Sequence, residues 1–128
     1  MASSVIKNIR RTTSQNIESN VASGVSVVNA VYFNYNSKVL SVRLRGVTFS
    51  SDNTGWFNVI RLPKDFRALN SVHQGCLVNE NSLEQTNYAY GVVECRINTD
   101  GWLQVYNANK KMRLWGEIIF INDLPMPS

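Results

Sequence analysis

The sequence contains one histidine, His73, among its 128 residues. A single histidine excludes a metal site built on two histidines, and it excludes a catalytic relay with several histidines to choose from. His73 falls within a strand-like run, which favours a hydrogen-bonded structural role over a catalytic one. We therefore expect neither a metal nor a cofactor.

Cysteine is almost as rare, with Cys76 and Cys95 as the two thiols of the chain. Two thiols do not make a disulfide framework, and these two lack the spacing of metal ligands. Both fall within strand-like runs, so we expect buried, reduced side chains. A bridge between them is the alternative.

A glycine-rich phosphate loop is also missing, because the glycines are scattered along the chain at its turns and bends. The acidic residues of the predicted loops are equally dispersed: Asp52, Asp65, Glu80, Glu84 and Asp100. A glycosidase needs two carboxyl groups about 5 to 9.5 Å apart, and the spacing of these residues indicates no such pair. We therefore predict that the protein is not an enzyme.

Long apolar runs are absent, and none approaches the ~20 residues of a membrane span. Lys7, Arg10 and Arg11 interrupt any apolar core of a secretion signal, so we expect a protein made in the cytoplasm or a part of a longer chain. The net charge is +4, and Arg43 and Arg45 share one strand face without forming part of a basic run. This balance suits ordinary solubility or a weak attraction to anionic polymers. It favours neither nucleic acid binding nor membrane insertion.

Residues 92–121 alternate as the strands of a half-buried sheet do. Apolar residues that fall on one face of an extended chain define three runs: Val93, Cys95 and Ile97; Leu103 and Val105; and Leu114, Ile118 and Phe120. Asp100 and Gly101 predict a tight turn between the first two runs, with positive φ at Gly101. A second reversal is expected at residues 107–110. The pattern predicts a three-strand antiparallel meander.

Further strand-like runs lie upstream, at residues 25–35, 40–49, 56–62 and 72–78. The first run is expected to place five apolar residues on one face: Val25, Val27, Val31, Phe33 and Tyr35. In the second run the apolar positions change parity after Gly46, which predicts a bulge there.

The runs together predict an all-β domain, an antiparallel β-sandwich or jelly-roll-like barrel of about seven to nine strands. The length fits a single core, which we assign to residues 24–128. Residues 1–23 are expected to be an arm or connector that meets another chain. Their apolar residues do not form continuous heptads, so a short helix, an extended arm and a stalk remnant stay open.

Two motifs, in their order and spacing, resemble a known family. The first, at residues 55–67, is Gly-Trp, a short strand, Leu-Pro and then Phe66 and Arg67; the second, at residues 97–106, passes through Asp-Gly-Trp into another strand. With the closing apolar strand they resemble the C-terminal head (knob) domain of tail-fibre and baseplate receptor-binding proteins of phages and prophages of Gram-positive bacteria. The resemblance covers residues 39–121. Ala68 stands where such proteins often have proline.

The resemblance implies a homotrimer that binds a host cell-wall saccharide or teichoic-acid-like polymer without turnover. It implies a place in the virion, at the tail tip or baseplate, after synthesis in the host cytoplasm. The N-terminal segment is then expected to contact other tail or baseplate proteins. A structural or assembly protein of the virion is the alternative, and a cellular lectin or adhesin module is a third, which needs a secretion route.

Candidate ligand residues are aromatic rings beside amides, because a sugar offers an apolar face for stacking and hydroxyls for amide hydrogen bonds. If Leu103 and Val105 fill the core, the residues that alternate with them lie on the outer face. The polar residues 79–87 and the tyrosines that follow form a second candidate surface. The predicted ligand residues are Asn87, Tyr88, Tyr90, Trp102, Gln104 and Tyr106. The alternative is that these rings pack against a neighbouring subunit.

Overall fold

The structure is a computed structural model, and it describes residues 10–12, 20–34, 39–63, 71–80 and 91–121. These residues form eight strands: β1 (Arg10–Thr12), β2 (Val25–Asn34), β3 (Val39–Phe49), β4 (Trp56–Arg61), β5 (His73–Asn79), β6 (Val92–Ile97), β7 (Trp102–Tyr106) and β8 (Arg113–Ile121). The predicted all-β fold is confirmed, and the strand number lies within the predicted range.

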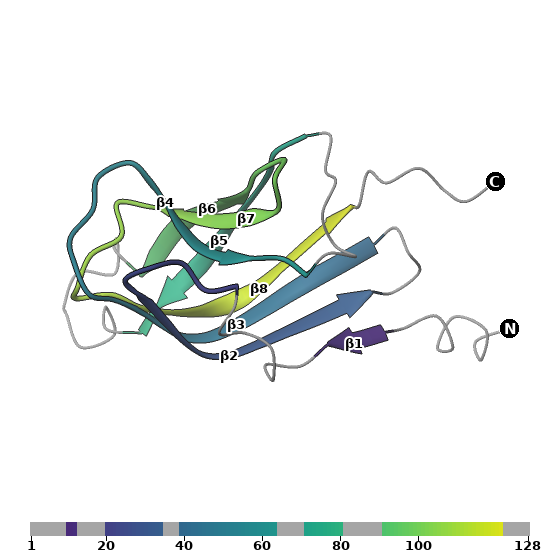
Figure 1. The fold of residues 1–128 in the computed structure, drawn as a ribbon, viewed down its shortest axis with the longest axis horizontal. Helices are drawn as coiled ribbons and strands as arrows, with labels where there is room; N and C mark the ends of the chain where they lie inside the picture. The colour runs from purple at the N-terminus through teal and green to yellow at the C-terminus, as the bar shows by residue number, and fades with distance from the viewer. Residues whose placement is uncertain (1–9, 13–19, 35–38, 64–70, 81–90, 122–128) are drawn as a thin grey trace, which may run out of the picture.

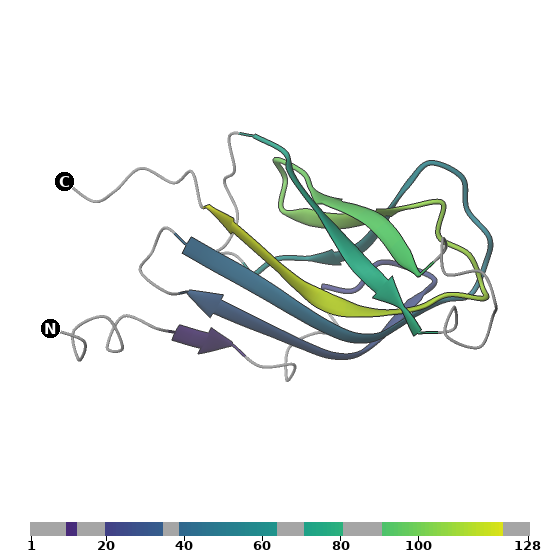
Figure 2. The same cartoon turned by 180° about the vertical axis from the view of Figure 1, so that it is seen from behind.

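The strands form one antiparallel sheet in the order β1-β2-β3-β8-β5-β6-β7-β4. The sheet curls so that β1, β2, β3 and β8 make one layer and β4, β6 and β7 face them, with β5 running between the two (Figures 1 and 2). Its two ends meet through residues 20–22, because the Ala22 N–H donates to the Val59 carbonyl and the Arg61 N–H to the Asn20 carbonyl, each at 2.9 Å. The fold is therefore a nearly closed barrel.

Within the predicted N-terminal arm, the described residues include a short strand and a bridge residue, Val21, that pairs with Ile60. Arg10–Thr12 form β1, which pairs with the far end of β2, and residues 20–22 form hydrogen bonds to the edge of β4 that does not pair with β7. The segment thus adds backbone pairing to the barrel on two sides.

The core lies between the two layers and is built from alternate residues of each strand. Its largest fully buried side chains come from both layers: Leu40, Leu44, Ile60, Leu62, Leu77, Ile97, Leu103 and Leu114. Cys95 and Val105 are buried beside them, whereas Trp102, Gln104 and Tyr106 point away. The alternation predicted for β6, β7 and β8 is confirmed.

The predicted three-strand meander is wrong in its third strand. β7 pairs with β6 and β4, whereas β8 pairs with β3 and β5. The connection between β7 and β8 is anchored to the loop before β4, because the Lys110 N–H donates to Asp52 Oδ1 at 3.0 Å and the Asn53 N–H donates to the Ala108 carbonyl at 2.7 Å. These anchors carry the chain to the opposite layer instead of back along β7.

The predicted bulge at Gly46 is confirmed, since the register between β3 and β8 shifts between Leu44 and Val47 and Gly46 has a φ of 64°. A Cβ atom at Gly46 would lie 2.5 Å from Val28 Cγ2, so a side chain there would have no room. Opposite Gly46, the residues of β2 that face the core change from odd-numbered to even-numbered positions.

As a result, the predicted face of β2 is wrong at its far end. Val25 and Val27 pack against the core, but beyond Val28 the inward residues are Ala30 and Tyr32. Val31 pairs with the exposed Arg43 and therefore lies on the outer face, and Phe33 follows it there. Tyr35 lies outside the described residues.

Candidate functional site

The outer face of β4, β6 and β7 carries polar and aromatic side chains in three cross-strand rows. Trp56 pairs with Tyr106 in the first row, and Arg61 pairs with Trp102 in the third. The middle row runs across four strands: Asn58, Gln104, Arg96 and Gln74. Residues directly opposite each other share a face, so three amides and one guanidinium lie between two pairs that contain aromatic rings.

Hydrogen bonds connect the middle row. Gln104 Nε2 donates to Asn58 Oδ1 at 2.7 Å, and Arg96 Nε donates to Gln104 Oε1 at 2.8 Å. Gln104 is therefore held as donor on one side and acceptor on the other. These two bonds use neither the amide nitrogen of Asn58 nor the terminal nitrogens of Arg96, which keep hydrogen-bond donors for a ligand.

The rings on this face are held in different ways. The Arg96 guanidinium lies 4.2 Å from the centre of the Trp56 ring, and Tyr106 meets Trp56 edge to face at 5.3 Å. Trp56 therefore acts mainly as a support for Arg96 and Tyr106. Tyr106 itself is 42% exposed.

At the other end of β7, Trp102 is partly exposed beside Arg61. The guanidinium carbon of Arg61 lies 5.9 Å from the ring centre of Trp102, and Arg61 Nε donates to the Asp100 carbonyl at 3.2 Å. The neighbouring turn is held by Asn98, whose Oδ1 accepts from the backbone N–H groups of Asp100 and Trp102. Trp102 is thus fixed through both its side-chain neighbour and its own backbone.

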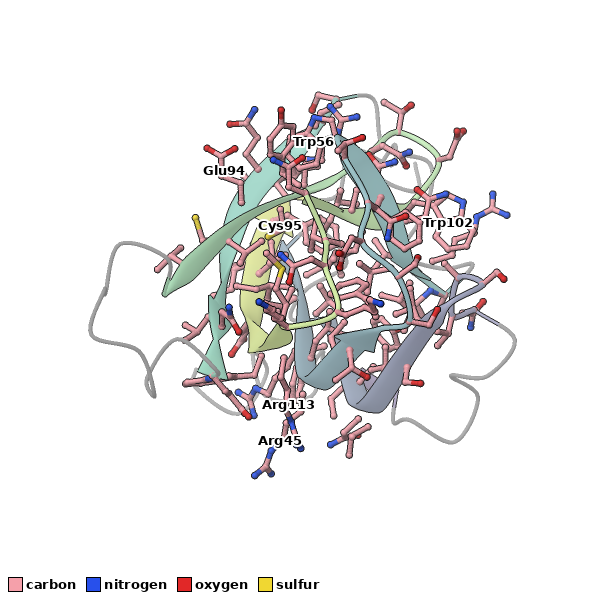
Figure 3. The ribbon with its side chains drawn as sticks, turned by 90° about the vertical axis from the view of Figure 1, so that its left-hand side faces the viewer. Arg45, Trp56, Glu94, Cys95, Trp102 and Arg113 are labelled. Atoms are coloured by element: carbon pink, nitrogen blue, oxygen red, sulfur yellow. The ribbon has the colours of Figure 1, made fainter. Side chains whose placement is uncertain are left out.

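The structure confirms that Trp102, Gln104 and Tyr106 share the outer face predicted for them. Asn87, Tyr88 and Tyr90 lie outside the described residues. Figure 3 shows Trp56 on the outside of the barrel at its upper edge and Trp102 on the outside at its right-hand side.

Sequence reasoning missed Trp56, Asn58, Arg61 and Arg96 as members of this face. Alternation in β4 could have indicated Trp56 and Asn58, but the register with β7 shifts between Asn58 and Ile60. That bulge buries both Val59 and Ile60 and breaks the alternation before Arg61. Arg96 alternates with buried residues of β6, but only the pairing of β6 with β7 places it beside Gln104.

The thiols lie on opposite faces of the sheet. Cys95 is buried, as predicted, whereas the prediction of a buried Cys76 is wrong because Cys76 is exposed and pairs with Glu94 on the outer face. Both are free, so the alternative of a bridge is wrong as well. Burial, together with the nearby Cys76, raises the pKa of the Cys95 thiol to about 12.

Two of the acidic residues of the predicted loops have structural partners. Asp52 accepts the Lys110 N–H, and Glu80 Oε2 lies 3.3 Å from Arg113 Nε. Among the described residues, no group of three His, Cys, Asp or Glu side chains could hold a metal ion. The outer face of β4, β6 and β7 offers ring surfaces and hydrogen-bond donors.

No protein-family model matches the chain, and no curated protein matches it. In the described part of the chain, no helix is both long and apolar enough to span a membrane. The geometry and chemistry of the outer face are therefore the basis for a functional assignment.

Proposed function

We propose that the chain is a non-enzymatic receptor-binding head of a phage tail fibre or baseplate, which attaches the virion to a saccharide of the host cell surface. The observation that carries this proposal is the row Asn58, Gln104 and Arg96, fixed by hydrogen bonds of 2.7 and 2.8 Å between Trp102 on one side and Tyr106 on the other. Ring platforms that flank fixed amides match a sugar, which has an apolar face and a rim of hydroxyls. The resemblance of the Gly-Trp motifs to phage head domains points to the same class.

The spacing of the rings favours a chain of sugars over a single unit. Trp102 and Tyr106 lie four residues apart on one strand, which separates them by about 13 Å along β7. Gln104 lies between them on the same face. An extended polysaccharide along β7 would therefore meet a ring, an amide and a second ring in succession.

Each such contact is weak, because a small ligand buries little area. We expect affinities per head in the micromolar to millimolar range, about −8 to −4 kcal/mol. Several heads on one virion then provide stable attachment through avidity. This arrangement suits a homotrimer carried at the tail tip or baseplate.

Binding of the purified chain to isolated cell-wall polysaccharide tests the proposal. Trp102→Ala and Tyr106→Ala should each weaken binding at least about tenfold, a loss of 1.4 kcal/mol or more, without changing the oligomeric mass. Val72→Ala is the matched control, since it removes an exposed apolar side chain that lies just before β5 and outside β4, β6 and β7. Normal binding by both ring variants would contradict the proposed site.

The second candidate is a structural or assembly protein of the virion tail or baseplate. One observation favours it: β8 exposes Trp115, Ile119 and Ile121 on its outer face, by 43%, 64% and 53%. Large exposed apolar side chains in a row are typical of packing surfaces. If Trp102→Ala and Tyr106→Ala instead break the oligomer into monomers, the rings are subunit contacts and this candidate is favoured.

A further inference from the structure

A groove with a volume of about 740 Å³ lies on the outer face of β2, β3 and β8. Its lining includes Arg43, Arg45, Glu80, Trp115 and Glu117. Figure 3 shows Arg45 and Arg113 together at the lower edge of the barrel, on the far side from Trp56. The groove is therefore separate from the saccharide face on β4, β6 and β7.

Most of the charge around this groove is neutralised in pairs. Arg43 Nη2 lies 3.0 Å from Glu117 Oε2, and Arg113 Nε lies 3.3 Å from Glu80 Oε2. Arg45 is exposed and makes no ion pair, hydrogen bond or ring contact, in contrast to Arg43, Arg61, Arg96 and Arg113 among the described side chains. Among the described residues, Arg45 is therefore the cation of the groove that has no acidic partner.

Trp115 differs from the other two tryptophans in its contacts. Trp56 contacts Tyr106 and Arg96, and Trp102 lies beside Arg61. Among the described residues, Trp115 has no ring or guanidinium partner, and 43% of it is exposed. A large, half-exposed ring on an outer sheet face is available to a ligand.

The fold brings these two side chains to the same place. The register between β3 and β8 moves from Leu44 opposite Gly116 to Val47 opposite Leu114, so Trp115 lies across from the bulge that contains Arg45 and Gly46. The positive φ of Gly46 maintains the bulge, and bulges re-aim the side chains beside them. Arg45 and Trp115 consequently line one groove from neighbouring strands.

We propose that this groove is a second ligand site, which binds a sugar ring carrying a single negative charge, such as a hexuronate unit of an acidic glycan. The Arg45 guanidinium binds the carboxylate through its planar fork, and the ring stacks on Trp115. A single charge fits because Glu80 and Glu117 line the same groove and repel a second one. The site is independent of the saccharide face and does not require that proposal to hold.

Titration of the intact chain with glucuronate, glucose and glucose 6-phosphate, followed by tryptophan fluorescence, tests the site. Glucuronate should bind more tightly than glucose, and added salt should weaken the difference. Glucose 6-phosphate, which is close to a dianion at neutral pH, should bind no more tightly than glucuronate. Equal affinity for glucose and glucuronate would overturn the proposal, and preference for the phosphate would overturn the single-charge assignment.

Variants locate the binding. Arg45→Gln and Trp115→Ala should each lower glucuronate affinity about tenfold with an unchanged melting temperature. Lys110→Gln removes the same charge from an exposed loop residue outside the groove and should leave the affinity unaltered. Loss of glucuronate binding in Trp102→Ala but not in Trp115→Ala would place the ligand on the other face and refute the proposal. So would a change of oligomeric mass in Trp115→Ala, which would make the ring a subunit contact.

Discussion

At the scale of single residues, Gly101 determines how β6 reverses into β7. Its φ is 85°, and its N–H donates to the Asn98 carbonyl at 3.0 Å. A β-branched residue is strained at this φ, so Gly101→Val should lower the free energy of unfolding by ~1 kcal/mol or more. Chemical denaturation measures the change, with Thr99→Val as a control that exchanges one β-branched residue for another in the same turn. An unchanged midpoint in Gly101→Val would show that the turn tolerates a side chain.

Cys95 links stability to alkaline pH. Burial raises the pKa of its thiol to about 12 in the folded chain, whereas an unfolded thiol ionises near about 8.5. The unfolded state therefore loses its proton first, so stability is full below about pH 8.5 and falls as pH rises toward 12. Melting temperatures recorded between neutral and alkaline pH measure how steeply stability falls as the pH rises.

Two comparisons check the role of Cys95. Cys95→Ala should flatten the alkaline slope, although removal of a buried side chain also lowers stability at neutral pH. Iodoacetamide should modify the exposed Cys76 of the native chain while leaving Cys95 unmodified. Equal modification of both thiols under native conditions would contradict the buried position.

At the scale of elements, the connection between β7 and β8 determines which layer β8 joins. Its anchor is Asp52 Oδ1, which accepts the Lys110 N–H at 3.0 Å. Asp52→Ala should cost about 0.5–1.5 kcal/mol of stability, the usual net value of one hydrogen bond. Asp52→Asn keeps an acceptor oxygen and should cost less, and Thr54→Ala changes an exposed residue of the same loop. Equal stability of all three variants would mean that the connection needs no anchor.

The elements also show what can be predicted from sequence. Strands β6 and β7 were predictable because buried and exposed residues alternate without interruption, and so were the outer positions of Trp102, Gln104 and Tyr106. β2 and β4 were harder, because the parity change at Val28 and the bulge after Asn58 reverse the alternation partway along each strand. Alternation describes one strand at a time, so it cannot show when a neighbour forces such a change.

Strand partners depend on contacts between distant residues. Arg43 and Glu117 are 74 positions apart, yet they are directly opposite each other on β3 and β8. Nothing local in residues 113–121 distinguishes this pairing from a hairpin with β7. The row Asn58, Gln104 and Arg96 is likewise assembled from three strands, so the sequence could indicate its middle member but not the other two.

At the scale of the whole molecule, the outer face of β8 bears on assembly. Ile119 and Ile121 are 64% and 53% exposed, so this strand presents a large apolar surface to solvent. We expect light scattering to give a homotrimer of the 14.5 kDa chain. Ile119→Lys should dissociate it, because a charge buried in an apolar contact costs several kcal/mol.

A matched substitution distinguishes assembly from general instability. The exposed fraction of Val92 on β6 is 59%, similar to the 64% of Ile119. Val92 belongs to a different strand pair, β5 and β6. Val92→Lys should therefore leave the trimer intact. A monomeric wild-type chain at micromolar concentration would count against the trimer altogether.

Residues 20–22, which cover the edge of β4 that does not pair with β7, also bear on solubility. Without them, the Val59 carbonyl and the Arg61 N–H lose their backbone partners, and β4 becomes an open edge strand. Open edges pair readily with the edges of other chains and promote aggregation. A chain shortened to begin at Gly24 should therefore precipitate or form irregular multimers even though all of β2 to β8 is retained. Residues 20–22 are thus expected to protect the barrel against uncontrolled self-association.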